Sequence, residues 1–148
     1  MEKTFFSLLL FLVLSACGSN KSVATRSQSN SNSSADTSFE IKQISQDDTY
    51  GYNKKNPVKV GGALKSMGPV NERKYLNSLL GPEGQDLLFY RVGSCCPFKT
   101  KNGIFGSGLL DIYKVYWQGS KDTLTIYINM YDKARLMAPK GLRIKSEF

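Results

Sequence analysis

The chain has 148 residues, a formal net charge of +8 at pH 7 and no histidine. Because histidine is absent, Ser-His-Asp triads and Cys-His pairs are excluded as catalytic machinery. A basic balance also raises nucleic acid as a partner, but the basic residues are scattered and form no run longer than Lys54-Lys55. We therefore expect a solvated basic surface and no nucleic-acid partner.

Residues 1–16 have the pattern of a secretory signal peptide, with Lys3 followed by an apolar run from Phe5 to Leu14. The run is too short to cross a bilayer as a helix. The sequence LSAC at positions 14–17 resembles the bacterial lipobox, in which the signal is cut before a cysteine that carries lipid. We expect acyl chains such as palmitate on Cys17 to anchor the protein to a membrane of the cell envelope, the outer membrane in our interpretation, outside the cytoplasm.

A flexible tether is predicted over residues 17–38, beginning at the lipidated cysteine. From Gly18 to Ser38, Ser and Asn fill eleven of the twenty-one positions, and aromatic residues, Leu and Ile are absent. Such a segment cannot bury enough apolar surface to fold. Residues 39–148 remain and predict one small domain with a modest core.

The stretch MGPVNERKYLNSLLGPEG, residues 67–84, predicts a helix. Pro69 suits the first helical turn, and Gly81 followed by Pro82 is a stop signal. The helix is expected to pack one apolar face on the rest of the domain. That face consists of Tyr75, Leu76, Leu79 and Leu80.

Two later segments, GLLDIYKVYW and DTLTIYINMY, predict a β-hairpin. Pairing Trp117 with Thr123 separates two faces, one aliphatic and one aromatic and polar. The aliphatic face would contain Leu110, Ile112, Tyr116, Leu124, Ile128 and Met130, and the other face Asp111, Tyr113, Val115, Trp117, Thr123, Thr125, Tyr127, Asn129 and Tyr131. DLLFYRVG predicts another strand, and FEIKQI and NPVKVGG are weaker candidates. The expected fold class is α+β, a small, mostly antiparallel sheet with one main helix.

Six segments between Tyr50 and Leu142 together resemble a family of small lipoproteins from Bacteroidota: YGYNKKNPVKVGG, GPVNERKYLNSLLGPEGQ, GSCCPFKT, GLLDIYKVY, YINMYD and APKGL. SCCPF and YINMYD are the more specific motifs, and family members often carry Pro where Lys101 stands and Phe where Leu142 stands. The family has no established activity, so the resemblance implies a lipoprotein but no reaction. Some members are labelled 2-dehydro-3-deoxyphosphooctonate aldolase. That enzyme is a (β/α)₈ barrel of about 250 residues, which residues 39–148 are too few to build.

Cys95 and Cys96 are the only cysteines besides Cys17. In an oxidising compartment each has the other as its nearest partner, which favours a vicinal disulfide, although adjacent Cα atoms lie closer than an ordinary disulfide prefers. The alternatives are two free thiols, one buried at the end of the strand and the other facing a loop, a redox or intermolecular pair, and a metal site. Adjacent side chains on a strand point to opposite faces and chelate poorly, so we expect no metal and no cofactor.

A candidate ligand face follows from the predicted hairpin register. It consists of Asp111, Tyr113, Trp117, Tyr127, Asn129 and Tyr131. Aromatic rings beside a carboxylate and an amide suit a saccharide or a peptide. The alternative, which we favour, is that the predicted helix covers this face, since sheets usually bury their tryptophan.

These patterns predict a lipid-anchored envelope protein with a non-enzymatic binding or structural domain. Its partners would be the membrane, through the lipid on Cys17, and an envelope protein or a glycan. A thiol-redox protein that uses Cys95 and Cys96 is the alternative function.

Overall fold

The computed structural model describes residues 40–145, so the predicted signal peptide, Cys17 and the tether lie outside the described part. The elements are, in chain order, β1 (Val58–Lys59), η2 (Ala63–Lys65), α1 (Gly68–Asn77), β2 (Leu79–Leu80), β3 (Leu88–Lys99), η3 (Ile104–Gly106), β4 (Ser107–Tyr116), β5 (Leu124–Asn129) and β6 (Arg143–Ile144). Within residues 40–145, no helix is both long and apolar enough to cross a membrane.

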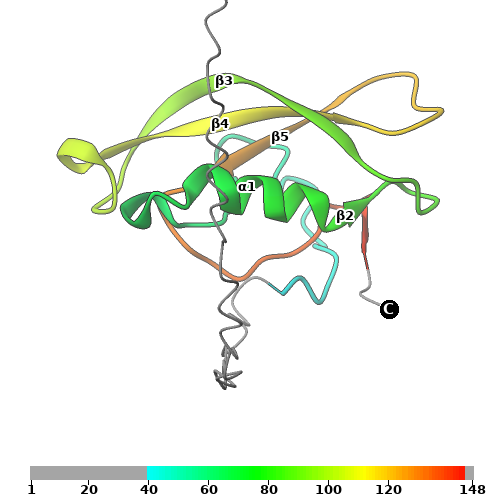
Figure 1. The fold of residues 1–148 in the computed structure, drawn as a ribbon, viewed down its shortest axis with the longest axis horizontal. Coiled ribbons are helices and arrows are strands. Elements are labelled where there is room, and N and C mark those ends of the chain that lie inside the picture. The colour runs from blue at the N-terminus through cyan, green and yellow to red at the C-terminus, as the bar shows by residue number, and fades with distance from the viewer. Residues whose placement is uncertain (1–39, 146–148) are drawn as a thin grey trace, which may run out of the picture. The chain divides into compact units, whose positions relative to one another are not determined.

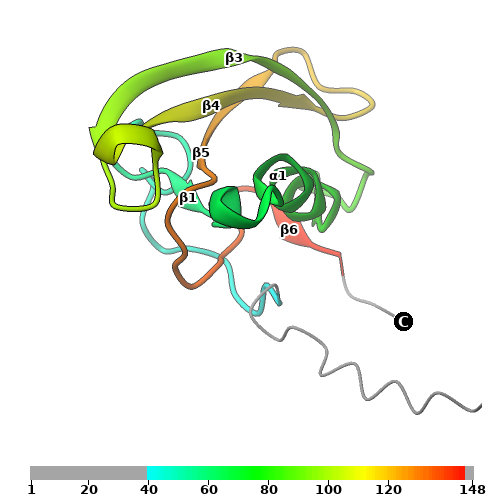
Figure 2. The same cartoon turned by 60° about the vertical axis from the view of Figure 1, so that its left-hand side comes forward.

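Four strands form one sheet in the order β1-β5-β4-β3 (Figure 1; β1 is labelled in Figure 2). β3, β4 and β5 pair antiparallel, whereas β1 runs parallel to β5 with Val58 beside Ile128. β2 and β6 pair antiparallel in a separate two-stranded sheet. One α-helix with mostly antiparallel strands confirms the predicted α+β class.

α1 lies against one face of the four-stranded sheet (Figures 1 and 2). Its residues Glu72, Tyr75 and Leu76 are buried, and the Tyr75 hydroxyl donates a 2.8 Å hydrogen bond to the carbonyl of Met137. Between the helix and the sheet lies the hydrophobic core. Its fully buried members include Val58, Tyr75, Leu76, Val115, Ile126, Ile128 and Ala138. The helix therefore buries Tyr75 and Leu76 against the rest of the domain, as the sequence predicted, whereas Leu79 and Leu80 lie beyond its end.

The helix ends at Asn77, before the Gly81-Pro82 stop signal that the sequence suggested. The Ser78 hydroxyl donates a 2.6 Å hydrogen bond to the carbonyl of Tyr75, and this bond closes the last turn. Leu79 and Leu80 then pair with Ile144 and Arg143, far away in the sequence. The prediction that both leucines continue the helix was wrong because this long-range pairing takes their backbone.

The hairpin has a register one residue away from the predicted one. Val115 pairs with Leu124 and Asp111 with Ile128, so Asp111, Tyr113 and Val115 share a face with Leu124, Ile126 and Ile128. This register is favoured because it brings Val115, Ile126 and Ile128, each 0% exposed, together on the face that α1 covers. The predicted separation into an aliphatic and an aromatic face is therefore wrong.

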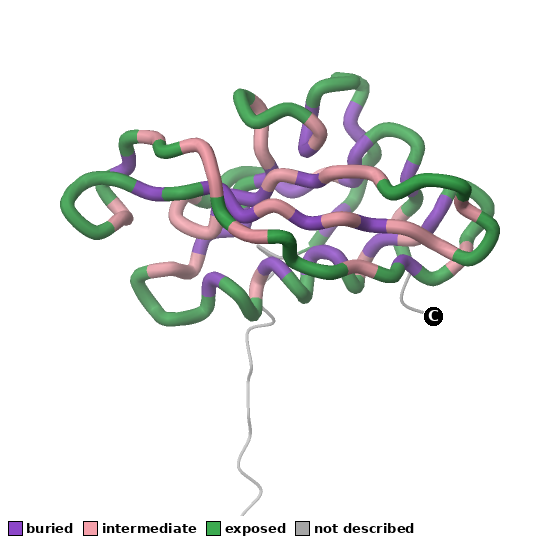
Figure 3. The backbone as a smooth tube through the Cα atoms, turned by 90° about the horizontal axis from the view of Figure 1, so that it is seen from above, coloured by how far each residue is buried: buried purple, intermediate pink, exposed green. Residues whose placement is uncertain are grey.

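The opposite face of the sheet is seen from above in Figure 3. The strand β3 forms an edge of the sheet, and none of its residues is buried. Tyr90 of β3 and Tyr116 of β4 contact each other edge to face, with ring centroids 6.5 Å apart. A pocket lies on this face, nearer the ends of β4 and β5 that bear Leu110 and Asn129.

Candidate functional site

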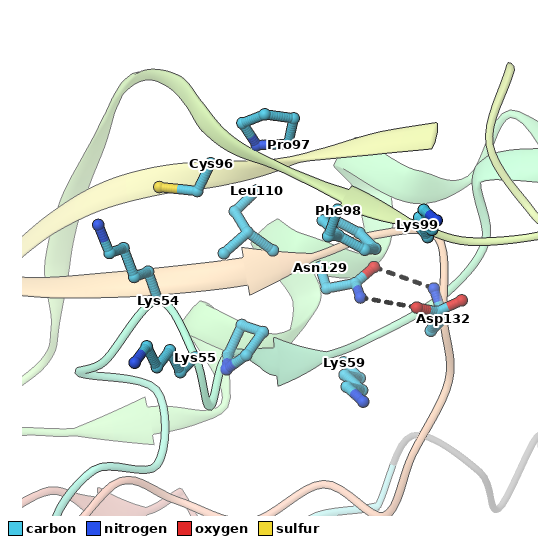
Figure 4. A pocket seen from close by; sticks show the side chains of 11 residues that line it. Lys54, Lys55, Lys59, Cys96, Pro97, Phe98, Lys99, Leu110, Asn129 and Asp132 are labelled. Carbon is cyan, nitrogen blue, oxygen red and sulfur yellow. Dashed lines mark hydrogen bonds between the residues drawn. The ribbon is translucent and has the colours of Figure 1, made fainter. Parts of the chain in front are cut away.

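A pocket of about 560 Å³ is the candidate site (Figure 4). Three parts of the chain contribute to it: β1 with the loop that leads into it, the second half of β3, and the neighbouring parts of β4 and β5 with the turn that follows β5. Its lining residues are Lys54, Lys55, Pro57, Lys59, Cys96, Pro97, Phe98, Lys99, Leu110, Asn129 and Asp132. The pocket thus combines apolar walls with a basic rim.

Two bulges shape the wall that β3 supplies. The pairing of β3 with β4 shifts by one residue between Arg91 and Gly93, and again between Cys95 and Phe98. At the second bulge Cys96 has a φ of 58°, in the left-handed region that non-glycine residues seldom occupy. Bulges redirect side chains and bend a strand, and this one brings Cys96 and Pro97 into the pocket wall.

Cys95 and Cys96 are joined by a disulfide, with their Cα atoms 3.7 Å apart. Both residues are half-buried, and Cys96 lines the pocket. Among residues 40–145, no group of three or more His, Cys, Asp or Glu side chains is arranged to hold a metal ion. Of the two cysteines, Cys96 alone is part of the pocket wall.

Four lysines give the pocket its charge. In Figure 4 the side chains of Lys54 and Cys96 point toward each other, with Leu110 beside them. Lys54, Lys55, Lys59 and Lys99 are all exposed, and within residues 40–145 none of them forms a salt bridge. These ammonium groups are therefore available to an anion that enters the pocket.

The single carboxylate of the pocket, Asp132, already has partners. It accepts hydrogen bonds from Thr100 at 2.6 Å, Asn102 at 3.1 Å and Asn129 at 3.0 Å. Burial raises the pKa of Asp132, but these hydrogen bonds, together with the charge of Lys59, outweigh burial and lower its pKa below the ordinary value. Asp132 is thus an ionised structural group that holds the end of β5 to the β3–β4 connection.

A second polar cluster lies on the other face of the sheet, against α1. The Tyr113 hydroxyl donates to Glu72 Oε2 at 2.9 Å. Arg91 Nη2 and Ser94 Oγ both donate to Asp111 Oδ1, at 2.8 and 2.7 Å. Glu72 is 0% exposed and Asp111 is 2% exposed, so both carboxyl groups are almost completely removed from water.

The two carboxyl groups of this cluster differ in protonation. Burial, and next the charge of Asp111, raise the pKa of Glu72 to about 8. Burial also raises the pKa of Asp111, but the hydrogen bonds from Arg91 and Ser94 outweigh it and lower the pKa below its ordinary value. At neutral pH the Glu72 carboxyl group is therefore protonated, and the Asp111 carboxyl group opposite it is ionised.

The residues predicted as one ligand face are dispersed. Asp111 and Tyr113 lie under α1, whereas Tyr127 and Asn129 point to the opposite face of the sheet. Trp117 is half-buried against the core, and Tyr131 follows β5 and contacts Phe98 edge to face at 5.9 Å. The prediction that these six residues share one face was wrong because the register is displaced by one residue. Only Asn129 lines the pocket.

The sequence interpretation did not identify the lysines of the pocket as a group, nor the partners of Asp111. Lys54-Lys55 was noted only as a short basic run, and nothing in the sequence places Lys59 and Lys99 beside it. Glu72 lies within the predicted helix, outside the apolar face that was assigned to it, and was not identified as a member of a polar cluster. Comparison of the chain with protein-family models, curated proteins and solved structures gives no match.

Proposed function

We propose that this protein is a lipid-anchored component of the cell envelope whose domain binds an anionic saccharide in the pocket beside Cys96. The lipobox-like sequence ending at Cys17 supports the anchor. The composition of the pocket supports the ligand class. The domain acts as a binding module and catalyses no reaction.

One observation carries the ligand class: four exposed lysines surround a pocket whose only carboxylate is already hydrogen-bonded. The electrostatic attraction between an anion and one ammonium group about 4 Å away is worth about 1 kcal/mol in bulk water and about 4 kcal/mol near a protein surface. The apolar side chains of Pro57, Pro97 and Phe98 offer flat contact to a sugar ring. Uronic acids and phosphorylated sugars combine both requirements, and envelope glycans are accessible to an exported protein.

Calorimetric titration of the full-length protein with trigalacturonate, and with neutral maltotriose for comparison, tests this function. We expect trigalacturonate to bind with an affinity that falls as salt is added, and maltotriose to bind at least tenfold more weakly. Lys54→Glu should reduce trigalacturonate binding about tenfold or more. Lys121→Glu, an exposed lysine in the turn at the far end of the hairpin, is the matched control and should bind as the wild type does.

Equal affinity for the neutral and the acidic trisaccharide would contradict the proposal, as would equal losses in Lys54→Glu and Lys121→Glu. The circular dichroism spectrum of each variant shows whether it is folded. Both substituted lysines are exposed, so neither change should disturb the core.

Thiol redox chemistry is the second candidate function, favoured by the position of Cys96 in the pocket wall opposite Lys54 (Figure 4). A nearby ammonium favours the thiolate that forms when a disulfide is reduced. In such a reaction an external dithiol would give two electrons and two protons to the Cys95–Cys96 disulfide and become a disulfide itself. The double variant Cys95→Ser/Cys96→Ser separates the two functions. A redox protein loses its activity, whereas a binding module keeps its preference for trigalacturonate over maltotriose, because that preference comes from the lysines.

A further inference from the structure

The connection between β3 and β4 carries two large apolar side chains into solvent. Ile104 is 77% exposed and Phe105 is 102% exposed. Phe105 has a φ of 55°, a conformation that is uncommon for a bulky residue. In Figures 1 and 2 this connection is the short yellow-green coil that projects beyond the end of the sheet.

This exposure does not come from a loose loop, because the base of the connection is tightly bonded. The Thr100 backbone N–H donates to the carbonyl of Gly106 at 3.0 Å, so the connection closes on itself. The side chains of Thr100 and Asn102 are both bonded to Asp132. The fold thus holds Ile104 and Phe105 outward on a firm base.

A second exposed apolar residue lies next to this connection. Leu64 of η2 is 75% exposed, and a hollow of about 310 Å³ is lined by both Leu64 and Ile104. Segments that are about forty residues apart in the sequence therefore present their apolar side chains together. We call Leu64, Ile104 and Phe105 the apolar tip.

The surroundings of the apolar tip are basic. Lys65 directly follows Leu64, and Lys101 precedes Ile104 by three residues; both lysines are exposed, and neither forms a salt bridge within residues 40–145. Neither η2 nor α1 has an acidic residue in its first turn. Asp132, the carboxylate that accepts hydrogen bonds from Thr100 and Asn102, has the partners described above. Apolar side chains flanked by unpaired lysines complement the acyl chains and charged headgroups of an anionic bilayer.

We propose that the apolar tip inserts into the surface of a bilayer that contains anionic lipid, with Lys65 and Lys101 against the headgroups. This surface is separate from the pocket beside Cys96, so the proposal does not depend on the ligand of that pocket. Burying one Phe side chain strengthens membrane binding about tenfold or more. Each lysine near the surface adds a contribution that salt weakens. A domain seated in this way would hold a fixed orientation on the membrane.

Fluorescence quenching in vesicles tests the insertion at a single residue. The full-length protein carrying Phe105→Trp is reconstituted with brominated phosphatidylcholine, alone or mixed with brominated phosphatidylglycerol. The chain has one native tryptophan, Trp117, which directly follows the other end of β4, and the wild type measures its background. Tyr90→Trp is the matched control, because Tyr90 is 53% exposed on β3 and lies far along the strand from the apolar tip.

We expect strong quenching of Phe105→Trp when phosphatidylglycerol is present, several-fold more than in the wild type or in Tyr90→Trp. Adding Lys65→Glu and Lys101→Glu to Phe105→Trp should remove most of it. No excess quenching of Phe105→Trp, or equal quenching of Tyr90→Trp, would overturn the proposal, and so would quenching that persists unchanged after charge reversal. The readout does not depend on acylation of Cys17, because it reports the depth of residue 105 itself.

Discussion

Glu72 of α1 and Tyr113 of β4 meet across the interface between the helix and the sheet, where the Tyr113 hydroxyl donates to Glu72 Oε2 at 2.9 Å. The other oxygen, Glu72 Oε1, is the one buried side-chain polar atom in the described part of the chain that has no hydrogen-bond partner. A carboxyl group in such a place is favoured in its neutral form. The pair therefore couples the stability of the domain to pH.

The free energy of unfolding should fall as the pH rises from about 5 to about 8, and then level off. The ordinary pKa of Glu72 is 4.5 and its folded pKa is about 8, so within this range the folded state keeps a proton that the unfolded chain releases. Asp111 acts in the opposite sense at lower pH, because its lowered pKa makes stability fall as acid protonates it. The chain has no histidine to titrate in the same window.

Urea unfolding at a series of pH values measures this dependence. Glu72→Gln should flatten the curve between about pH 5 and 8, since the amide does not ionise. Glu83→Gln, an exposed acid outside the core, should keep the wild-type slope. A wild-type stability that rises across this window would show that Glu72 is ionised in the folded protein.

Removing the hydroxyl that Glu72 accepts should destabilise the domain. Tyr113→Phe removes the hydrogen bond that Glu72 Oε2 accepts inside the core, and a buried polar atom that loses its partner costs about 1–3 kcal/mol. Tyr116→Phe removes a hydroxyl from the half-exposed opposite face and should change stability by less than about 0.5 kcal/mol. Chemical denaturation compares the two variants, and equal stabilities would mean that the Tyr113 hydroxyl makes no net contribution.

The disulfide between Cys95 and Cys96 should be found in the native protein isolated from cells. Mass spectrometry of the unreduced peptide from Arg91 to Lys101 is expected to show a mass lower by two hydrogens than that of the dithiol. Alkylation before reduction should label neither cysteine. If both thiols take up the reagent without reduction, they are free in the cell. The redox function would then lack the Cys95–Cys96 disulfide that it requires.

Cys17 should carry lipid. After metabolic labelling with a fatty acid, the label should follow the protein into the membrane fraction and disappear in Cys17→Ser. Cys95→Ser/Cys96→Ser, which leaves residues 14–17 unchanged, is the control and should remain labelled. Wild-type protein found free in the soluble periplasm would contradict the anchor.

The sequence by itself determined the fold class and most of the strands. Pro69 marked the helix start, and the β-branched and aromatic segments marked β4 and β5, because these signals act on the nearest neighbours in the chain. The adjacency of Cys95 and Cys96 likewise made a vicinal disulfide an expectation from chemistry alone. Local propensity and covalent geometry are enough for conclusions of this kind.

Tertiary structure alone decided the hairpin register, the end of α1 and the make-up of the pocket. The register depends on which hydrophobic residues α1 covers, and a shift of one residue moves Asp111 and Tyr113 to the face that bears Glu72. Leu79 leaves the helix because Ile144 pairs with it. Lys54 and Lys99 become neighbours of one pocket only after β3, β4, β5 and the loop before β1 are assembled. Long-range pairing and burial decide these features, and local patterns in the sequence do not predict them.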